Sequence, residues 1–147
     1  MPNNLKNVLI NGAHIWARNF TGREDLPYNP AGRRNFCVSL DPDLARDLRE
    51  EGWNVKFPDP DSDRLPYLSV NVSYENYPPQ IFKVTSHGKT LLDEDNVGTL
   101  DDDEIENVDL IIRPYQWDVG GRSGVKAYVK KMYVTIVEDE LDAKYAD

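Results

Sequence analysis

The sequence predicts a mostly β domain: a barrel-like antiparallel sheet with short helices inserted between its strands. Segments in which apolar and polar residues alternate recur along the chain, and this period of two is typical of strands with one buried face. Clusters of glycine and proline stand between these segments and predict turns. Few stretches favour helix, so we expect a small closed or partly open barrel, with a β-sandwich as the alternative.

The size of the chain fits one domain. Its 147 residues, 39% of them hydrophobic, are enough to form a single core. We find no apolar run of about 18 residues, the length that a membrane-spanning helix needs. The N-terminal residues lack the apolar stretch of a secretory signal. Cys37 is the only cysteine, which excludes an intramolecular disulfide and favours a reducing compartment.

Each expected element rests on a local pattern in the sequence. The clearest helix is 41–52, where Asp41 suits the N-cap and Pro42 the first helical position. A second, short helix is expected to start near Asp101, because acidic side chains favour a helix N-terminus. The pair Gly120–Gly121 predicts a hairpin turn. The expected strands are 6–20 (with a bulge at Gly12), 33–40, 53–57, 67–74, 80–86, 109–117 and 125–137.

The alternation also predicts which strand faces form the core. Residues two apart in a strand point to the same side, so the apolar member of each pair of positions should face inward. The residues expected in the core are Phe36, Val38, Leu40, Leu68, Val70, Val72, Leu110, Ile112, Val125, Ala127 and Val129.

The negative charge is concentrated in two segments. The formal net charge is −9, yet residues 93–109 alone hold nine acids and no base. Residues 138–147 hold five acids and one lysine, which leaves a balance of +4 on the rest of the chain. Because the acids are segregated, the remainder can carry a basic face despite the acidic total. We therefore divide the chain into a barrel domain, 1–137, and an acidic C-terminal tail, 138–147.

The last two strands carry aromatic and cationic side chains on one face. A turn centred on Gly121–Arg122 places Tyr115 opposite Tyr128, whereas a slip of one residue would separate the two sets. Rings that alternate with cations suit a single nucleic-acid strand, whose bases stack while its phosphates are held. In the alternative, the rings pack under a loop and the lysines extend into solvent. The candidates are Arg113, Tyr115, Trp117, Lys126, Tyr128 and Lys130.

The same pattern recurs in the first strand and the loop after it. In HIWARNF, the period of two places Trp16, Arg18 and Phe20 on one face. The following loop adds cations, and a barrel of the oligonucleotide-binding (OB) type holds its ligand with a loop in this place. In the alternative, Trp16 or Phe20 is a core residue beneath the loop. The loop candidates are Arg23, Arg33 and Arg34.

Six segments together resemble a family of phage-encoded single-stranded DNA-binding proteins. They are IWARNFTGRE, AGRRNFCVSLD, EEGWNVKF, VTSHGKTLLDED, NVDLIIRPYQW and VKAYVKKMYVTIVEDELDAKYAD, in that order. They cover most of the chain, from about Ile15 to its end. The resemblance implies an OB-fold and binding of single-stranded DNA regardless of sequence. It also implies a role in phage DNA replication or recombination in the cytoplasm of the infected bacterium, and no catalysis.

The acidic tail has a place in the same interpretation. An acidic C-terminus can bind a basic pocket of a replication or recombination protein, or fold back on the chain's own basic groove until DNA displaces it. In the alternative it is simply a solvated terminus. A homodimer is also left open. The tail residues considered are Glu138, Asp139, Glu140, Asp142, Tyr145 and Asp147.

No motif predicts a metal, a cofactor or a catalytic centre. Residues 93–104 match a calcium loop in part, but Val97 stands where a calcium ligand is needed. The two histidines lack the ligand spacing of a zinc site. The leading hypothesis is therefore a single-stranded DNA-binding module. The alternatives are an acidic protein-interaction module that imitates nucleic acid and, third, a metal-assisted enzyme built on the acidic loop.

Overall fold

The structure is a computed structural model that describes residues 5–75, 77–139, 141, 144 and 145. Within them nine strands form one sheet with the main path β1-β8-β9-β5-β3-β2. The mostly β, OB-like fold class is confirmed, and β1 and β2 end the path without closing it. The elements are β1 (Val8–Ile10), β2 (Ile15–Asn19), β3 (Arg34–Ser39), α1 (Pro42–Glu50), β4 (Val55–Lys56), β5 (Tyr67–Val72), β6 (Gln80–Thr85), β7 (Gly88–Leu92), η1 (Val97–Asp101), β8 (Ile105–Val119) and β9 (Arg122–Ile136).

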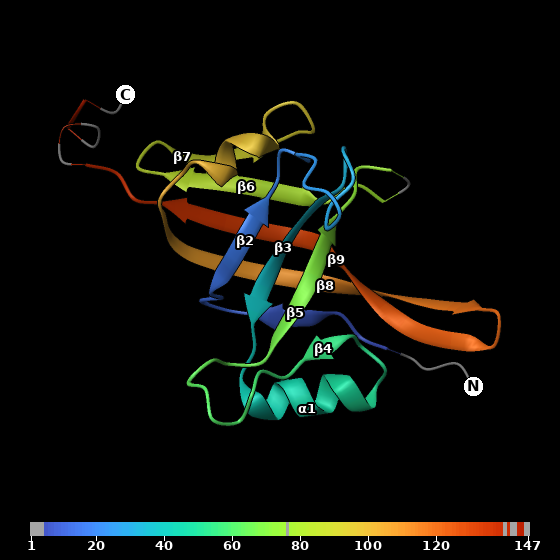
Figure 1. The fold of residues 1–147 in the computed structure, drawn as a ribbon. Coiled ribbons are helices and arrows are strands. Elements are labelled where there is room, and N and C mark those ends of the chain that lie inside the picture. The colour runs from blue at the N-terminus through green and yellow to red at the C-terminus, as the bar shows by residue number, and fades with distance from the viewer. Residues whose placement is uncertain (1–4, 76, 140, 142–143, 146–147) are drawn as a thin grey trace.

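The sheet bends into two layers around the core. Figure 1 shows β2, β3 and β5 crossing in front of β8 and β9, with α1 at the lower end and the β8–β9 hairpin extending beyond the rest. The apolar sides of the two layers face each other. All eleven predicted core residues are buried, with exposed fractions between 0% for Val38 and 4% for Val125.

The sheet is not wholly antiparallel, because β9 has two parallel neighbours. The β8–β9 hairpin fills one edge of β9 with an antiparallel neighbour. The other edge is taken by β5 and, further along, by β6, and both run parallel to β9. Parallel neighbours need long connections, and those from β5 and β6 to β9 contain β7, η1 and β8.

The N-terminal strand predicted at 6–20 is two strands. Gly12 adopts a φ of +63°, which glycine tolerates at little steric cost, and its N–H donates to Asp109 Oδ1 at 3.0 Å. Before this turn β1 pairs with β8, and after it β2 pairs with β3. Gly12 is thus a turn that transfers the chain between layers, not a bulge within one strand.

The helices and the remaining strands follow their predicted positions with local differences. The carboxylate of Asp41 accepts hydrogen bonds from the N–H groups of Asp43 and Leu44 at the start of α1, as expected of an N-cap. The second helix is a short 3-10 segment that ends at Asp101 rather than starting there. Strand β7 was not predicted. No helix among the described residues has the length and apolarity to cross a membrane.

Candidate nucleic-acid interface

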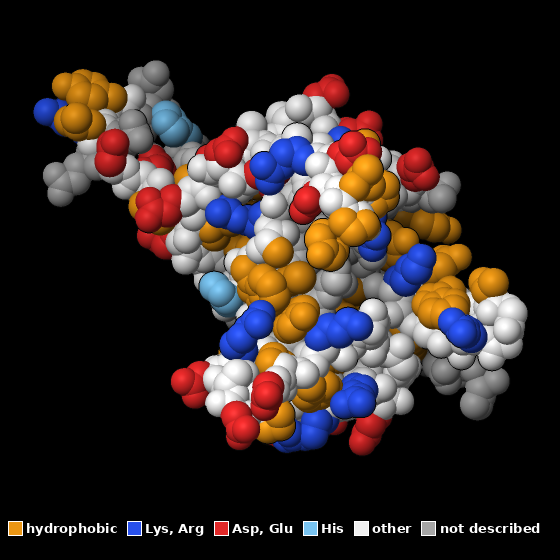
Figure 2. All heavy atoms as spheres, in the orientation of Figure 1, with side chains coloured by type: hydrophobic (Ala, Val, Ile, Leu, Met, Phe, Trp, Pro, Cys, Tyr) orange, Lys and Arg blue, Asp and Glu red, His pale blue; other side chains and the backbone are white. Residues whose placement is uncertain are grey.

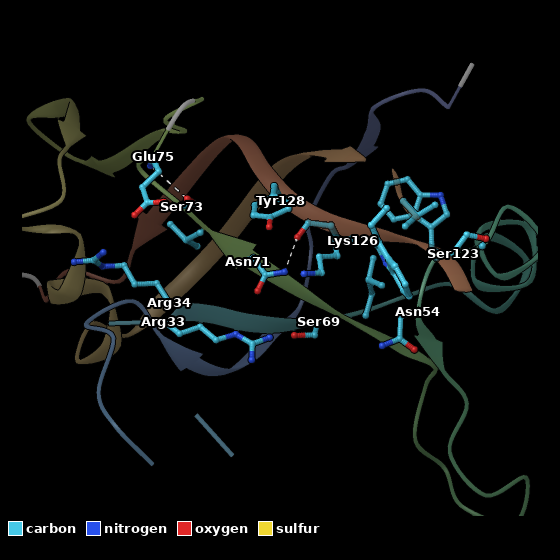
Figure 3. Close-up of a pocket in the computed structure, with 18 of the residues that line it drawn as sticks. Arg33, Arg34, Asn54, Ser69, Asn71, Ser73, Glu75, Ser123, Lys126 and Tyr128 are labelled. Carbon is cyan, nitrogen blue, oxygen red and sulfur yellow. Dashed lines mark hydrogen bonds between the residues drawn. The ribbon is translucent and has the colours of Figure 1, made fainter. Parts of the chain in front are cut away.

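A groove of about 810 Å³ crosses the outer side of β5 and β9. Its floor is polar, because the outward residues of β5 include Ser69 and Asn71. Figure 3 shows Asn71 at the centre, Tyr128 and Lys126 to one side, and Arg33 reaching across toward Ser69. The Asn71 amide donates to the Ala127 carbonyl at 3.2 Å, which fixes the side chain on the floor.

The charge of this groove is opposite to that of the whole chain. The charged residues that line it are four cations, Arg33, Arg34, Arg49 and Lys126, and one acid, Glu75. Figure 2 shows Lys and Arg side chains spread across the middle of this face, with most Asp and Glu side chains toward its upper and lower margins. The predicted segregation of charge thus produces a basic surface on an acidic protein.

The β8–β9 hairpin supplies the aromatic side of the groove, in a register that differs from the predicted one. The turn is Gly120–Gly121, so Tyr115 lies opposite Lys126, and Arg113 lies opposite Tyr128. Moving the turn by one residue shifts each partner by two positions. Because an even shift preserves the face, Arg113, Tyr115, Trp117, Lys126 and Tyr128 still share one side of the hairpin.

Rings and cations on this side are in direct contact. Tyr115 meets Tyr128 edge to face, with centroids 6.1 Å apart and planes at 79°. The Arg113 guanidinium lies 5.3 Å from the Tyr128 ring and 5.1 Å from that of Tyr77, in the β5–β6 connection. Tyr115 remains 51% exposed. Such partly exposed rings beside cations match the stacking platforms that bind single strands.

Trp117 reaches the groove because its cross-strand neighbour has no side chain. It lies opposite Gly124, and a Cβ at that position would approach the indole Cζ2 to 2.9 Å. Glycine therefore lets the indole lie across β9 beside the groove. Trp117 and Gly124 both line the groove.

Lys130 does not take its predicted place opposite Arg113. Ile112 pairs with Val129 and Ile111 with Lys131, which makes Lys130 the extra residue of a β-bulge. The bulge reverses the inward–outward alternation of β9. Val129 and Met132 both point to the core, so Lys131 and Tyr133 emerge on the side of Tyr128, whereas an unbroken period of two would place them on the side of Val129.

Trp16 lies on the same outer face, two strands from the groove floor. It pairs with Cys37 of β3, which in turn pairs with Ser69 of β5. Its ring meets Tyr67 edge to face at 4.8 Å, and the Arg64 guanidinium lies 5.7 Å from the indole. Trp16, Tyr67 and Arg64 thus form a second cluster of aromatic and cationic side chains beyond the groove floor.

Phe20, near Trp16 in the sequence, turns away from this face. Ala17 has a φ of +52°, and the β2–β3 register shifts after Trp16. As a result Phe20 is 0% exposed and stacks on Phe36 at 5.3 Å in the core. The prediction that Phe20 contacts DNA is wrong, because a fully buried ring has no free face for a base.

Arg18 and Arg34 act within the fold. Arg18 Nη1 donates to the carbonyls of Leu100 and Asp103 at 2.7 and 2.8 Å and so holds η1 against β2. Arg34 Nε donates to the Phe20 carbonyl at 2.9 Å, and Nη1 lies 3.7 Å from Glu94 Oε2. Both arginines therefore also hold the fold together: Arg34 does so while lining the groove, and Arg18 while lining a second, neighbouring hollow.

The loop between β2 and β3 lies beside the groove and extends it. Arg23 and Tyr28 line a second hollow of about 550 Å³, which shares Arg33 and Ser69 with the groove. Tyr28 is 81% exposed. Asn29 braces the loop from inside, because its amide donates to the carbonyls of Arg23, Pro30 and Arg33.

Comparison with known proteins agrees with this geometry. Residues 2–147 match the family model described as "Putative phage ssDNA-binding domain". The chain belongs to this family. No curated protein sequence matches it.

The fold of this family member is also found in solved structures. The single-stranded DNA-binding protein from bacteriophage Enc34, in a C-terminal truncation, aligns with a TM-score of 0.56 and 10% identity over 90% of this chain and 87% of that one. The same protein in complex with ssDNA aligns with a TM-score of 0.56 and 10% identity over 90% and 88% of the two chains. At such low identity the likeness shows a shared fold.

In this family member much of the acidic segment 93–109 is occupied by internal contacts. Asp101 accepts hydrogen bonds from the backbone N–H groups of Phe20 and Thr21 and from the Thr21 hydroxyl. Asp103 pairs with Lys83 at 2.6 Å. Asp101 thus fastens η1 to the end of β2 and the start of the loop that carries Arg23 and Arg33, and Asp103 fastens the segment after η1 to β6. Their role inside the fold weakens the alternative that the segment imitates nucleic acid.

The start of the acidic tail is attached to the β6–β7 turn. Glu138 accepts hydrogen bonds from the Ser86 N–H and, at 2.8 Å, from the Ser86 hydroxyl. The backbone hydrogen bond is the main reason why the pKa of Glu138 lies below its usual value. Tyr145 is 72% exposed. The tail candidates Glu140, Asp142 and Asp147 lie outside the described residues.

Several groove residues had no assignment from sequence. Ser69 and Asn71 were expected to point outward, but serine and asparagine carry no signal of a ligand. Arg49 and Trp53 reach the groove only because α1 ends there. Cys37 is partly buried, and burial raises the pKa of its thiol, so the reactive thiolate is disfavoured.

Proposed function

We propose that this protein binds single-stranded DNA without sequence preference through the groove on β5 and β9. The observation that carries the proposal is the charge reversal in the groove: four cations and one acid line it in a chain with a net charge of −9. The partly exposed rings of Trp117 and Tyr128 lie beside these cations. A polyanion with stackable bases is the ligand class that uses both features.

Each group has a separate role in the proposed complex. Tyr128, Tyr115 and Trp117 offer ring faces for bases, while Lys126, Arg113 and Arg33 hold phosphates. Stacking is tolerant of sequence because every base has a π face. The floor hydroxyl of Ser69 and the Asn71 amide oxygen add polar contacts to whichever base or sugar lies above them. Trp16 with Arg64 and Arg23 with Tyr28 extend the path at its far end.

The protein serves in phage DNA replication or recombination in the cytoplasm of the infected host, and it binds without catalysis. Membership of the phage ssDNA-binding domain family supports this role. The barrel domain 1–137 carries the DNA site, and the tail 138–147 contacts replication or recombination proteins. The ssDNA complex of the Enc34 protein supports the same ligand class for this fold.

A titration of intrinsic tryptophan fluorescence tests the proposal. Labelled or unlabelled single-stranded DNA, single-stranded RNA and duplex DNA are compared over a series of salt concentrations. We expect quenching by the DNA single strand and an affinity that falls linearly with salt on a log–log plot, because bound phosphates release counterions. Absence of salt-sensitive binding to any single strand would refute the proposal.

A further inference from the structure

We infer that bound single-stranded DNA continues beyond the groove onto a second stacking site on β6, β7 and β9, the β6–β9 platform. The platform consists of Phe82, Lys89, Lys131 and Tyr133. This inference rests on the proposed function, and it concerns a surface outside both hollows that make up the proposed groove and its extension.

The platform has the composition of a single-strand binding surface. Phe82 and Tyr133 are cross-strand neighbours in the parallel β6–β9 pair, and their rings stack with centroids 4.8 Å apart and planes within 10°. Lys89 Nζ lies 5.3 Å from the Phe82 ring and 5.7 Å from that of Tyr133. Lys131 Nζ lies 5.6 Å from the Tyr133 ring. Both rings are partly exposed.

The two lysines are available to an anionic ligand. No ion pair joins Lys89 or Lys131 to another residue in the described part of the chain. The acid opposite Tyr133 on β8 is Asp109. Its oxygens accept hydrogen bonds from Gly12 N–H and, at 3.3 Å, from the Asn107 amide. These hydrogen bonds partly compensate its charge, so the local balance still favours a phosphate.

The bulge at Lys130 connects the platform to the groove. Without it, Lys131 and Tyr133 would point into the core; with it, they emerge on the same side of β9 as Tyr128. Tyr128 and Tyr133 pair with Arg113 and Asp109 on β8, which are four residues apart. At a rise of about 3.3 Å per residue, their separation along the strand is about 13 Å.

Intervening contacts bridge this separation. Arg113 lies against both Tyr128 and Tyr77, and the connection that carries Tyr77 leads into β6, where Gln80 pairs with Lys131. Rings and cations therefore follow one another along β9 from the groove to the platform. An extended polyanion that leaves the groove past Tyr128 meets the same chemistry again, which favours DNA over an unrelated protein partner.

The test compares a short and a long ligand. Site sizes for one OB-fold are about 4–16 nucleotides, so an oligothymidylate of about 6 nucleotides lies near the lower end of this range and one of about 20 exceeds it. The variant is Lys89→Gln combined with Lys131→Gln, since both changes remove the charge, keep a polar side chain and leave the rings in place. Arg46→Gln, a change on the exposed side of α1 and outside both hollows, is the matched control for loss of charge. Thermal unfolding confirms that each variant is folded.

We expect the double variant to bind the short oligonucleotide like the wild type. For the long one, the log–log salt slope should fall in magnitude by about 1.4, because each lost contact to a single-strand phosphate removes about 0.7. Tyr133→Leu should weaken only the long ligand, by about 5-fold to 150-fold, as expected for one lost base stack.

Wild-type behaviour of both variants with the long ligand would overturn the inference and leave the groove proposal intact. The inference is also overturned if both variants bind the long oligonucleotide like the wild type but no longer bind an acidic protein. Failure of the wild type to bind either oligonucleotide would refute the groove proposal itself, and the inference with it.

Discussion

Replacement of Tyr128 tests the stacking role of the groove most directly. Tyr128 is partly exposed, lines the groove and stands opposite Arg113. Tyr128→Leu keeps a branched apolar side chain at this position but removes both ring faces, whereas Tyr128→Phe keeps them. If a base stacks on this ring, the leucine variant should lose about 1–3 kcal/mol of binding free energy, which is about a 5-fold to 150-fold rise in Kd.

The effect of this change on folding is separable from its effect on binding. The leucine variant loses the edge-to-face pair with Tyr115, worth about 0.5–1.5 kcal/mol. It also loses the contact with the Arg113 guanidinium, worth about 0.5–1 kcal/mol at an exposed site. Both losses appear in the free energy of unfolding from denaturant titrations. The binding loss is measured by tryptophan quenching under conditions in which the variant is fully folded.

The salt dependence distinguishes stacking from charge at Tyr128. Because no charge is removed, the log–log salt slope of Tyr128→Leu should equal that of the wild type while the whole line shifts to weaker binding. Tyr145→Leu, in the tail, is the matched control and should bind like the wild type. Unchanged affinity in Tyr128→Leu, or an equal loss in Tyr128→Phe, would refute the stacking argument.

Four further predictions test the charges and the corrected core. Lys126→Gln should reduce the magnitude of the salt slope by about 0.7 in a fluorescence titration, through the loss of one phosphate contact. Glu75→Gln should strengthen binding in the same assay, because it removes the acid that lines the groove. Phe20→Ala should lower the free energy of unfolding by about 3–5 kcal/mol in denaturant titrations, while Phe20→Leu should fold and bind DNA normally. The pKa of Glu138 is lowered by its hydrogen bonds to Ser86. The stabilising contribution of the carboxylate is therefore present above the usual pKa of 4.5 and is lost as the pH falls through the lower pKa of the folded state. The melting temperatures of the wild type and Glu138→Gln should differ at neutral pH and converge in acid.

The strand faces of the barrel were predictable because burial imposes a strict period of two. The outward set on the hairpin survived an error in the turn, since moving it by one residue shifts the partners by an even number. The helix cap at Asp41 was predictable for a different reason: it depends only on residues within one turn of chain. Local patterns of this kind need no knowledge of the tertiary fold.

The errors fall where the backbone leaves the regular period. Alanine at position 17 gives no sign of the positive φ that it adopts, and this one residue turns Arg18 and Phe20 away from the face of Trp16. The bulge at Lys130 does leave a trace. Apolar residues stand at 125, 127 and 129 and then at 132, 134 and 136, a change of phase that indicates an extra residue between the two sets.

The distribution of charge also explains how an acidic protein can present a basic groove. Asp101 and Asp103 are bound to backbone N–H groups, a hydroxyl and Lys83 on the side of the barrel where η1 meets β2. The contacts of Asp101 position the same loop that brings Arg33 to the groove. An acid that holds the cation-bearing loop in place supports the site through the fold. Its negative charge is partly compensated by the groups that hydrogen-bond to it. Removing the acid at position 101 should therefore weaken DNA binding through disorder of the loop, although the net charge of the protein would become less negative.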